Sequence, residues 1–159
     1  MLWMGSVLIA AAMGWAAAMY VQAGAPLDGA EDAYLRFGNA LRTPDALERT
    51  ETLVKLTKQL TPETLPGAIR AYHDDLYPLE TVDLRILMAY WAKHEPRRML
   101  EEVGGWSDSR VQRLAAAQAI AEVAKNEGYD SARAIYDEMP TYMSSAGLPN
   151  LVIGMIEHG

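Results

Sequence analysis

The first 27 residues of the chain contain no Lys, Arg, Asp or Glu, and its formal charges begin only at Asp28. Residues 2–23 read LWMGSVLIAAAMGWAAAMYVQA and would reach about 33 Å as an α-helix. That length matches a hydrocarbon core of about 30 Å, and the aromatic residues near its ends suit the two membrane interfaces. We therefore expect residues 1–25 to be a transmembrane anchor or signal segment. Residues 26–159 are expected to form a separate water-soluble domain.

Two fates of this segment remain open. Residues 21–23 (VQA) place small or short apolar residues where a signal peptidase reads them, so cleavage after Ala23 is one possibility. The apolar stretch is longer than the usual signal-peptide core of about 7–15 residues and has no basic residue before it, which favours an uncleaved single-pass anchor. By the positive-inside rule, Arg36 and Arg42 would place the body in the cytoplasm. An export-signal origin would place it outside, and we expect an extracytoplasmic (periplasmic) body.

Small residues recur every fourth position within the apolar segment. Ala10, Gly14 and Ala18 would share one helix face, which allows another transmembrane helix to approach closely. An alanine-rich segment also produces this spacing by chance. If the stripe is used, the protein is a small single-pass accessory subunit of a larger membrane complex.

The charged part of the chain is acidic. Its 14 basic and 21 acidic residues give a net charge of −7, which argues against binding to nucleic acid because phosphate backbones are repelled. Cysteine is absent, which excludes disulfides, thiolate metal sites and a cysteine nucleophile.

Apolar residues recur at helical rather than strand spacing, which predicts an all-α body. The Thr-Pro pairs at 43–44 and 61–62 are typical of an N-cap followed by proline at the first helical position, and Ser107 is expected to cap a long helix. Leu47 is expected to face the core. About eight short helices are predicted, over residues 30–42, 44–60, 62–72, 79–94, 96–104, 108–126, 130–139 and 149–157, with a mobile loop at 141–148.

The spacing of these elements predicts a repeat. Pro62 and Pro96 are 34 residues apart and each is expected to open a helix. A period near 33 with two helices per unit is typical of α-hairpin arrays. Residues 90–103 (YWAKHEPRRMLEEV) and 123–139 (VAKNEGYDSARAIYDEM) resemble successive units of a tetratricopeptide-like or HEAT-like solenoid. The resemblance implies an extended surface for binding protein; an irregular helical bundle is the alternative.

No group of residues in the sequence is typical of a catalytic site. His73 and the two aspartates after it come closest to a metal site, but neighbouring helical residues point about 100° apart. The acidic pairs Glu101-Glu102 and Asp137-Glu138 fit solvated helix faces better than acid–base catalysis. We therefore expect a non-enzymatic protein without metal or cofactor. An active site whose carboxylates meet only in three dimensions is the alternative.

Tyr90, His94, Arg97 and Arg98 are the candidate partner-binding residues. Tyrosine and arginine are enriched in binding hot spots, and residues 97–98 form the one adjacent basic pair in the acidic body. The expected function is a membrane-tethered helical-repeat module that binds or scaffolds another protein.

A structural role is the alternative for the same residues. The tyrosine would then be part of the core beside Trp91, and the two arginines would pair with Glu101 and Glu102 four residues further along the helix.

Overall fold

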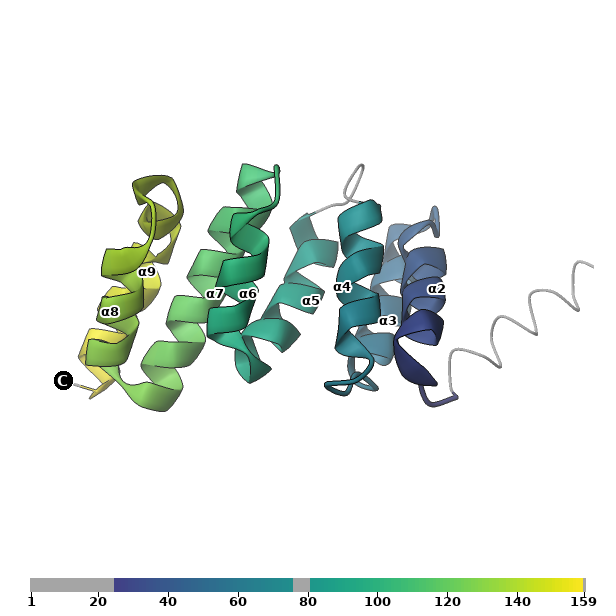
Figure 1. Cartoon of the computed structure of the whole chain (residues 1–159), viewed down its shortest axis with the longest axis horizontal. Helices are drawn as coiled ribbons and strands as arrows, with labels where there is room; N and C mark the ends of the chain where they lie inside the picture. Colours follow the sequence, from purple (N-terminus) through teal and green to yellow (C-terminus); the bar gives the residue numbers. More distant parts are fainter. Residues whose placement is uncertain (1–24, 76–80, 159) are drawn as a thin grey trace, which may run out of the picture. The chain divides into compact units, whose positions relative to one another are not determined.

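The computed structural model describes residues 25–75 and 81–158, and within these ranges it contains eight α-helices and no strand (Figure 1). The prediction of an all-α protein is confirmed for this part of the chain. The chain divides into two compact units, one ending at Leu79 and the other beginning at Glu80.

Unit 1 contains α2 (Gly29–Leu41), α3 (Ala46–Thr57) and α4 (Leu65–Asp74). Helix α2 packs along α4 and also contacts α3. The approach of α2 to α4 is close because Gly67 has no side chain: a Cβ there would collide with the backbone carbonyl of Ala30. The rings of Phe37 and Tyr72 meet across this contact at a centroid distance of 6.1 Å. Both are fully buried, together with Ala33, Leu53, Ala68 and Ala71.

Helix α3 begins later than predicted. Asp45, not Thr43, is its N-cap, and the Asp45 carboxylate accepts a 2.8 Å hydrogen bond from the backbone N–H of Glu48. Aspartate caps a helix at least as well as threonine, so the nearby carboxylate takes the role. The prediction that Leu47 faces the core is wrong, because its side chain is 79% exposed.

Helix α4 also begins later than predicted, at Leu65. Residues 62–64 form a turn, in which the Thr64 hydroxyl accepts a 2.9 Å hydrogen bond from the backbone N–H of Thr61. Pro66 lies in the first turn of α4, where the missing N–H would have no helical partner anyway. Pro62 does not open a helix, so the 34-residue spacing between Pro62 and Pro96 does not connect two helix starts.

Unit 2 contains α5 (Thr81–His94), α6 (Pro96–Gly104), α7 (Ser109–Glu127), α8 (Tyr129–Glu138) and α9 (Thr141–His158). Each helix contacts the next, and α7 also contacts both α5 and α9. Pro96 opens α6 and Gly128 ends α7, as the sequence predicts; Gly128 has a φ of 90°, which suits glycine. The core contains Leu84, Leu87, Met88 and Trp91 of α5, Met99 and Val103 of α6, and Val111, Ala115, Ala116, Ala119 and Ile120 of α7.

The prediction of a mobile loop at 141–148 is wrong. Helix α9 is continuous and contains Pro149, although proline removes one backbone hydrogen bond. Contacts to α7 offset this loss: the Asn150 side chain donates a 2.8 Å hydrogen bond to the carbonyl oxygen of Ala117. Gly147 is buried against Ile120 at a distance that leaves no room for a Cβ. Tertiary packing therefore overrides the local loop signal.

Candidate functional site

The four predicted partner-binding residues lie on the two sides of the turn between α5 and α6 in unit 2. We call Tyr90, His94, Arg97 and Arg98 the α5–α6 corner. Tyr90 and His94 lie one helical turn apart at the end of α5, and their ring centroids are 4.4 Å apart. Partial burial raises the pKa of Tyr90, so its hydroxyl stays protonated and can donate a hydrogen bond at neutral pH.

Arg97 forms an ion pair with a residue 30 positions away. Its Nη1 and Nη2 atoms donate hydrogen bonds of 2.7 and 2.6 Å to the two carboxylate oxygens of Glu127, at the C-terminal end of α7. Hydrogen bonding raises the pKa of the Arg97 guanidinium and lowers the pKa of the Glu127 carboxyl. Both groups therefore stay charged at neutral pH. The side chains remain 54% and 38% exposed, so the pair faces solvent.

Arg98 pairs with Glu95, the residue between the two helices, at 3.1 Å. The expected pairing of the arginines with Glu101 and Glu102 is therefore wrong. Both arginines lie in the first turn of α6, where the positive end of the helix dipole disfavours cations. The carboxylates of Glu95 and Glu127 offset this charge.

The neighbouring tryptophans belong to the core. Trp91 and Trp106 are buried, and the Trp91 indole N–H has no hydrogen-bond partner among the residues that the structure describes. The Trp106 carbonyl accepts a 2.7 Å hydrogen bond from the Gln112 side chain, which also donates to the carbonyl of Gly104 at 3.1 Å. The buried amide of Gln112 thus provides a hydrogen-bond donor for the carbonyl at the end of α6 and holds the turn into α7. The structural alternative holds for Trp91, whereas the four corner residues keep exposed or partly exposed side chains.

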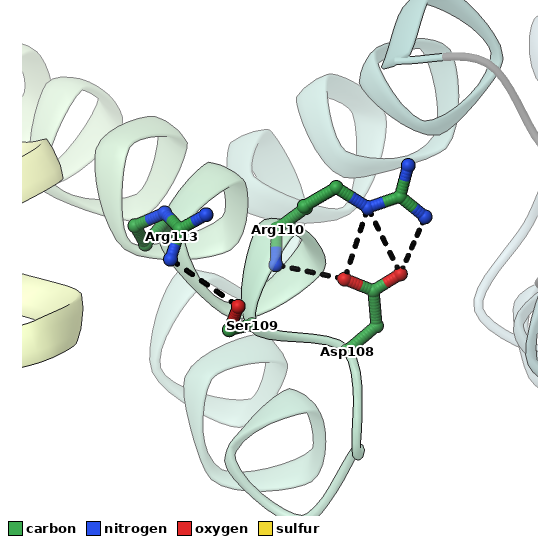
Figure 2. Close-up of polar contacts among 4 residues, drawn as sticks. All are labelled: Asp108, Ser109, Arg110 and Arg113. Carbon is green, nitrogen blue, oxygen red and sulfur yellow. Dashed lines mark hydrogen bonds and ion pairs between the residues drawn. The ribbon is translucent and has the colours of Figure 1, made fainter.

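Asp108 caps α7 in place of the predicted Ser107 (Figure 2). Its buried carboxylate accepts hydrogen bonds from the Arg110 backbone N–H at 2.8 Å and from the Arg110 guanidinium, the shortest at 2.6 Å. Bonding to the Arg110 side chain, followed by backbone bonding, lowers the pKa of the Asp108 carboxyl. Next to it, the Ser109 hydroxyl accepts a 3.2 Å bond from Arg113. These contacts fix the start of α7. The sequence feature that could have indicated this cap is an aspartate two residues before an arginine.

No group of three or more His, Cys, Asp or Glu side chains is arranged to hold a metal ion within residues 25–75 and 81–158. His73 lies exposed near the end of α4, with its Nδ1 atom 3.5 Å from the Asp74 carboxylate.

The predicted membrane segment at residues 2–23 lies outside the described residues, and so do Ala10, Gly14 and Ala18. Among the helices that the structure does describe, none has the length and apolar character needed to cross a bilayer.

Comparison with known proteins adds no further assignment. No protein-family model matches the chain, and no curated protein or solved structure is significantly similar to it. The resemblance to tetratricopeptide-like and HEAT-like repeats therefore stays a prediction.

Proposed function

We propose that this protein is a membrane-tethered, non-enzymatic helical-repeat module that binds another protein through the α5–α6 corner. The observation that carries the proposal is the corner itself. Two arginines, a tyrosine and a histidine lie on the two sides of this turn with exposed or partly exposed side chains. Arginine and tyrosine contribute a disproportionate share of binding energy at protein interfaces.

The ion pairs of the α5–α6 corner can be exchanged for ion pairs with carboxylates of a partner protein. Arg97 and Arg98 are each about half exposed and each bonded to a carboxylate of this chain. Exposed ion pairs of this kind contribute little to stability, so a carboxylate of a partner can replace Glu95 or Glu127 at small cost. Arg98 uses one of its nitrogens, Nη1, in its bonds to Glu95, and a guanidinium carries five N–H donors. The corner therefore favours a partner surface that offers carboxylates or carbonyl oxygens.

The order of helix contacts supports the repeat part of the proposal. In unit 2, the contacts follow chain order: α5 with α6 and α7, α7 with α6, α8 and α9, and α8 with α9. In unit 1, α2 contacts α3 and α4. Contacts limited to neighbouring elements are the pattern of stacked α-hairpins, which present extended surfaces to partners.

The membrane tether is tested on the protein from its native cell. We expect the chain to stay in the membrane pellet after alkaline carbonate extraction and to retain Met1, because residues 2–23 are apolar over a bilayer-spanning length. The measurements are fractionation and mass determination of the N-terminal peptide. Recovery in the soluble fraction with a new start at Gly24 would show export with cleavage instead of anchoring.

The corner is tested by reversing its charge in the full-length protein. We expect Arg97→Glu with Arg98→Glu to abolish co-purification of the partner, because partner carboxylates would then meet like charge. The matched control is Arg133→Glu, which removes an exposed arginine from its ion pair with Asp137 on α8. Quantitative mass spectrometry of co-purified proteins from native membranes gives the readout.

A charge-swapped pair separates binding from stability. Arg97→Glu with Glu127→Arg keeps an ion pair between α6 and α7 while reversing its direction. If Arg97 contacts the partner, this variant unfolds like the wild type and still loses the partner. Retention of the partner by both the swapped variant and the charge-reversed variant would remove the corner from the proposal.

A further inference from the structure

Arg36 of α2 bonds to the backbone of the residues that precede its own helix. Its Nη2 atom donates a 2.9 Å hydrogen bond to the carbonyl oxygen of Ala25, and its Nη1 atom donates a 3.2 Å bond to the carbonyl oxygen of Pro26. The Arg36 side chain is largely buried, with 10% of it exposed. A guanidinium withdrawn from water needs oxygen acceptors in its place, and these two carbonyls supply them.

Asp32 of α2 bonds to the same stretch of backbone. Its Oδ2 atom accepts a 3.0 Å hydrogen bond from the backbone N–H of Asp28 and a 3.3 Å bond from Nη1 of Arg36. Residues 25, 26 and 28 are thus all hydrogen-bonded to side chains of α2. We call Arg36 and Asp32, together with the backbone of residues 25–28, the α2 clamp.

The α2 clamp begins two residues after the predicted membrane segment. That segment ends at Ala23, and Ala25 is the first residue that Arg36 holds. Two residues of chain reach at most about 7 Å. Gly24 alone therefore separates the predicted end of the membrane segment from backbone that is bonded to unit 1.

We propose that Arg36 is a positioning residue that holds unit 1 at the bilayer surface, by clamping the chain directly after the membrane segment. This inference rests on the proposed membrane tether and names the residue through which the tether acts on unit 1. Without the clamp, residues 24–28 would become a five-residue linker with a root-mean-square length of about 12 Å. With the clamp, the connection outside unit 1 is one residue long.

Proteolysis between Leu27 and Asp28 tests the clamp in the full-length protein in mild detergent. We expect a protease that cuts before aspartate to cleave Arg36→Met there about tenfold faster than the wild type, because hydrogen bonds to a charged group shift a local opening equilibrium by about that factor. Methionine keeps an apolar stem and removes the donors. Mass spectrometry of the released peptide measures the rate. Equal rates in the two proteins would overturn the clamp.

Arg42→Met is the matched control. Arg42 lies at the other end of α2, where it is 63% exposed and pairs with Asp75 at 2.9 Å. Its removal should leave the cutting rate between residues 27 and 28 unchanged, and circular dichroism checks that each variant is folded. Asp32→Asn is the milder second variant, expected to accelerate cutting less than Arg36→Met. Equal acceleration by Arg42→Met would show general destabilisation and overturn the clamp.

Energy transfer to the bilayer tests the positioning. A fluorophore on Leu35→Cys reports on α2, because Leu35 is 55% exposed and the chain has no cysteine of its own. The full-length protein is placed in phosphatidylcholine vesicles that carry an acceptor on the lipid headgroups. Four Gly-Ser pairs inserted after Gly24 add about 16 Å of root-mean-square length and are expected to lower the transfer roughly twofold. The inserted residues leave the clamp intact, so the cutting rate should stay at the wild-type value.

Arg36→Met is expected to lower the transfer in the same direction as the insertion. A clamp that only stabilises the start of α2 would change the cutting rate and leave the transfer unchanged, which would overturn the positioning role. If Arg36→Met does not fold, Asp32→Asn takes its place in both measurements. Absence of the chain from floated vesicles would overturn the tether and the positioning with it, whereas unchanged cutting in detergent would overturn the clamp alone.

Discussion

Gly67→Ala is expected to lower the free energy of unfolding of unit 1 by about 3 kcal/mol, the upper end of the usual cost of overpacking. A Cβ at Gly67 would collide with the backbone carbonyl of Ala30, and backbone cannot rotate away as a side chain can. Helices α2 and α4 would have to separate, which would loosen the contact between Phe37 and Tyr72. Hydrogen exchange of the α2 and α4 amides in the full-length protein measures the change.

Gly38 provides the matched control on the same pair of helices. A Cβ at Gly38 would lie 3.8 Å from the nearest atom, a carboxylate oxygen of Asp75, which is ordinary van der Waals contact. Alanine also stabilises a helix interior by about 0.5–1 kcal/mol relative to glycine. We therefore expect Gly38→Ala to preserve or increase protection. Equal protection of α2 in the two variants would show that close α2–α4 packing does not hold unit 1 together.

Trp91→Ala is expected to destabilise unit 2 by about 3–5 kcal/mol. Trp91 is fully buried on α5, which contacts α6 and α7, and its removal leaves a cavity that rigid helices fill poorly. Urea unfolding of the full-length protein, followed by hydrogen exchange in residues 81–158, measures the loss.

Trp91→Phe separates the contribution of volume from that of hydrogen bonding. Within residues 25–75 and 81–158 the buried indole N–H has no partner, so phenylalanine removes none of the described hydrogen bonds and relieves an unsatisfied donor. A loss of only about 1 kcal/mol is expected, because most of the apolar volume is kept. If Trp91→Phe proved as damaging as Trp91→Ala, the indole N–H would have a role that the structure does not show.

Tyr90→Ala should affect partner binding more than stability, since Tyr90 is only partly buried.

Much of the helical pattern could be predicted from local signals. In unit 2, Pro96 begins α6 and Gly128 ends α7 as expected, because proline suits a first helical turn and glycine suits a positive φ. The same type of signal failed at the Thr-Pro pairs of unit 1. At the first pair, the Asp45 carboxylate caps α3 in place of Thr43. At the second pair, α4 begins only at Leu65, after a turn in which the Thr64 hydroxyl accepts from the Thr61 N–H and makes no cap bond to α4. Local rules find that a helix starts nearby, but the contacts of the neighbouring residues decide where it begins.

The residue types were enough to select the corner residues from the sequence. They were not enough to predict which carboxylates the two arginines pair with. The sequence placed glutamates four residues after each arginine, and the structure pairs Arg97 with Glu127 and Arg98 with Glu95 instead. Glu127 is 30 residues away along the chain, so its proximity follows from the packing of α6 against α7. The exposure of Leu47 likewise depends on which face of α3 meets α2.

The amino-acid sequence by itself determined the helical class of the described residues, the helix ends at Pro96 and Gly128, and the confinement of all charge to residues 28–159. These features depend on backbone geometry and side-chain chemistry within about one helical turn. The tertiary structure alone decided that α9 continues through Pro149, that Arg97 bonds to Glu127, and which face of α9 stays uncovered. Those outcomes depend on contacts between residues about 30 positions apart, whose energies no local pattern contains.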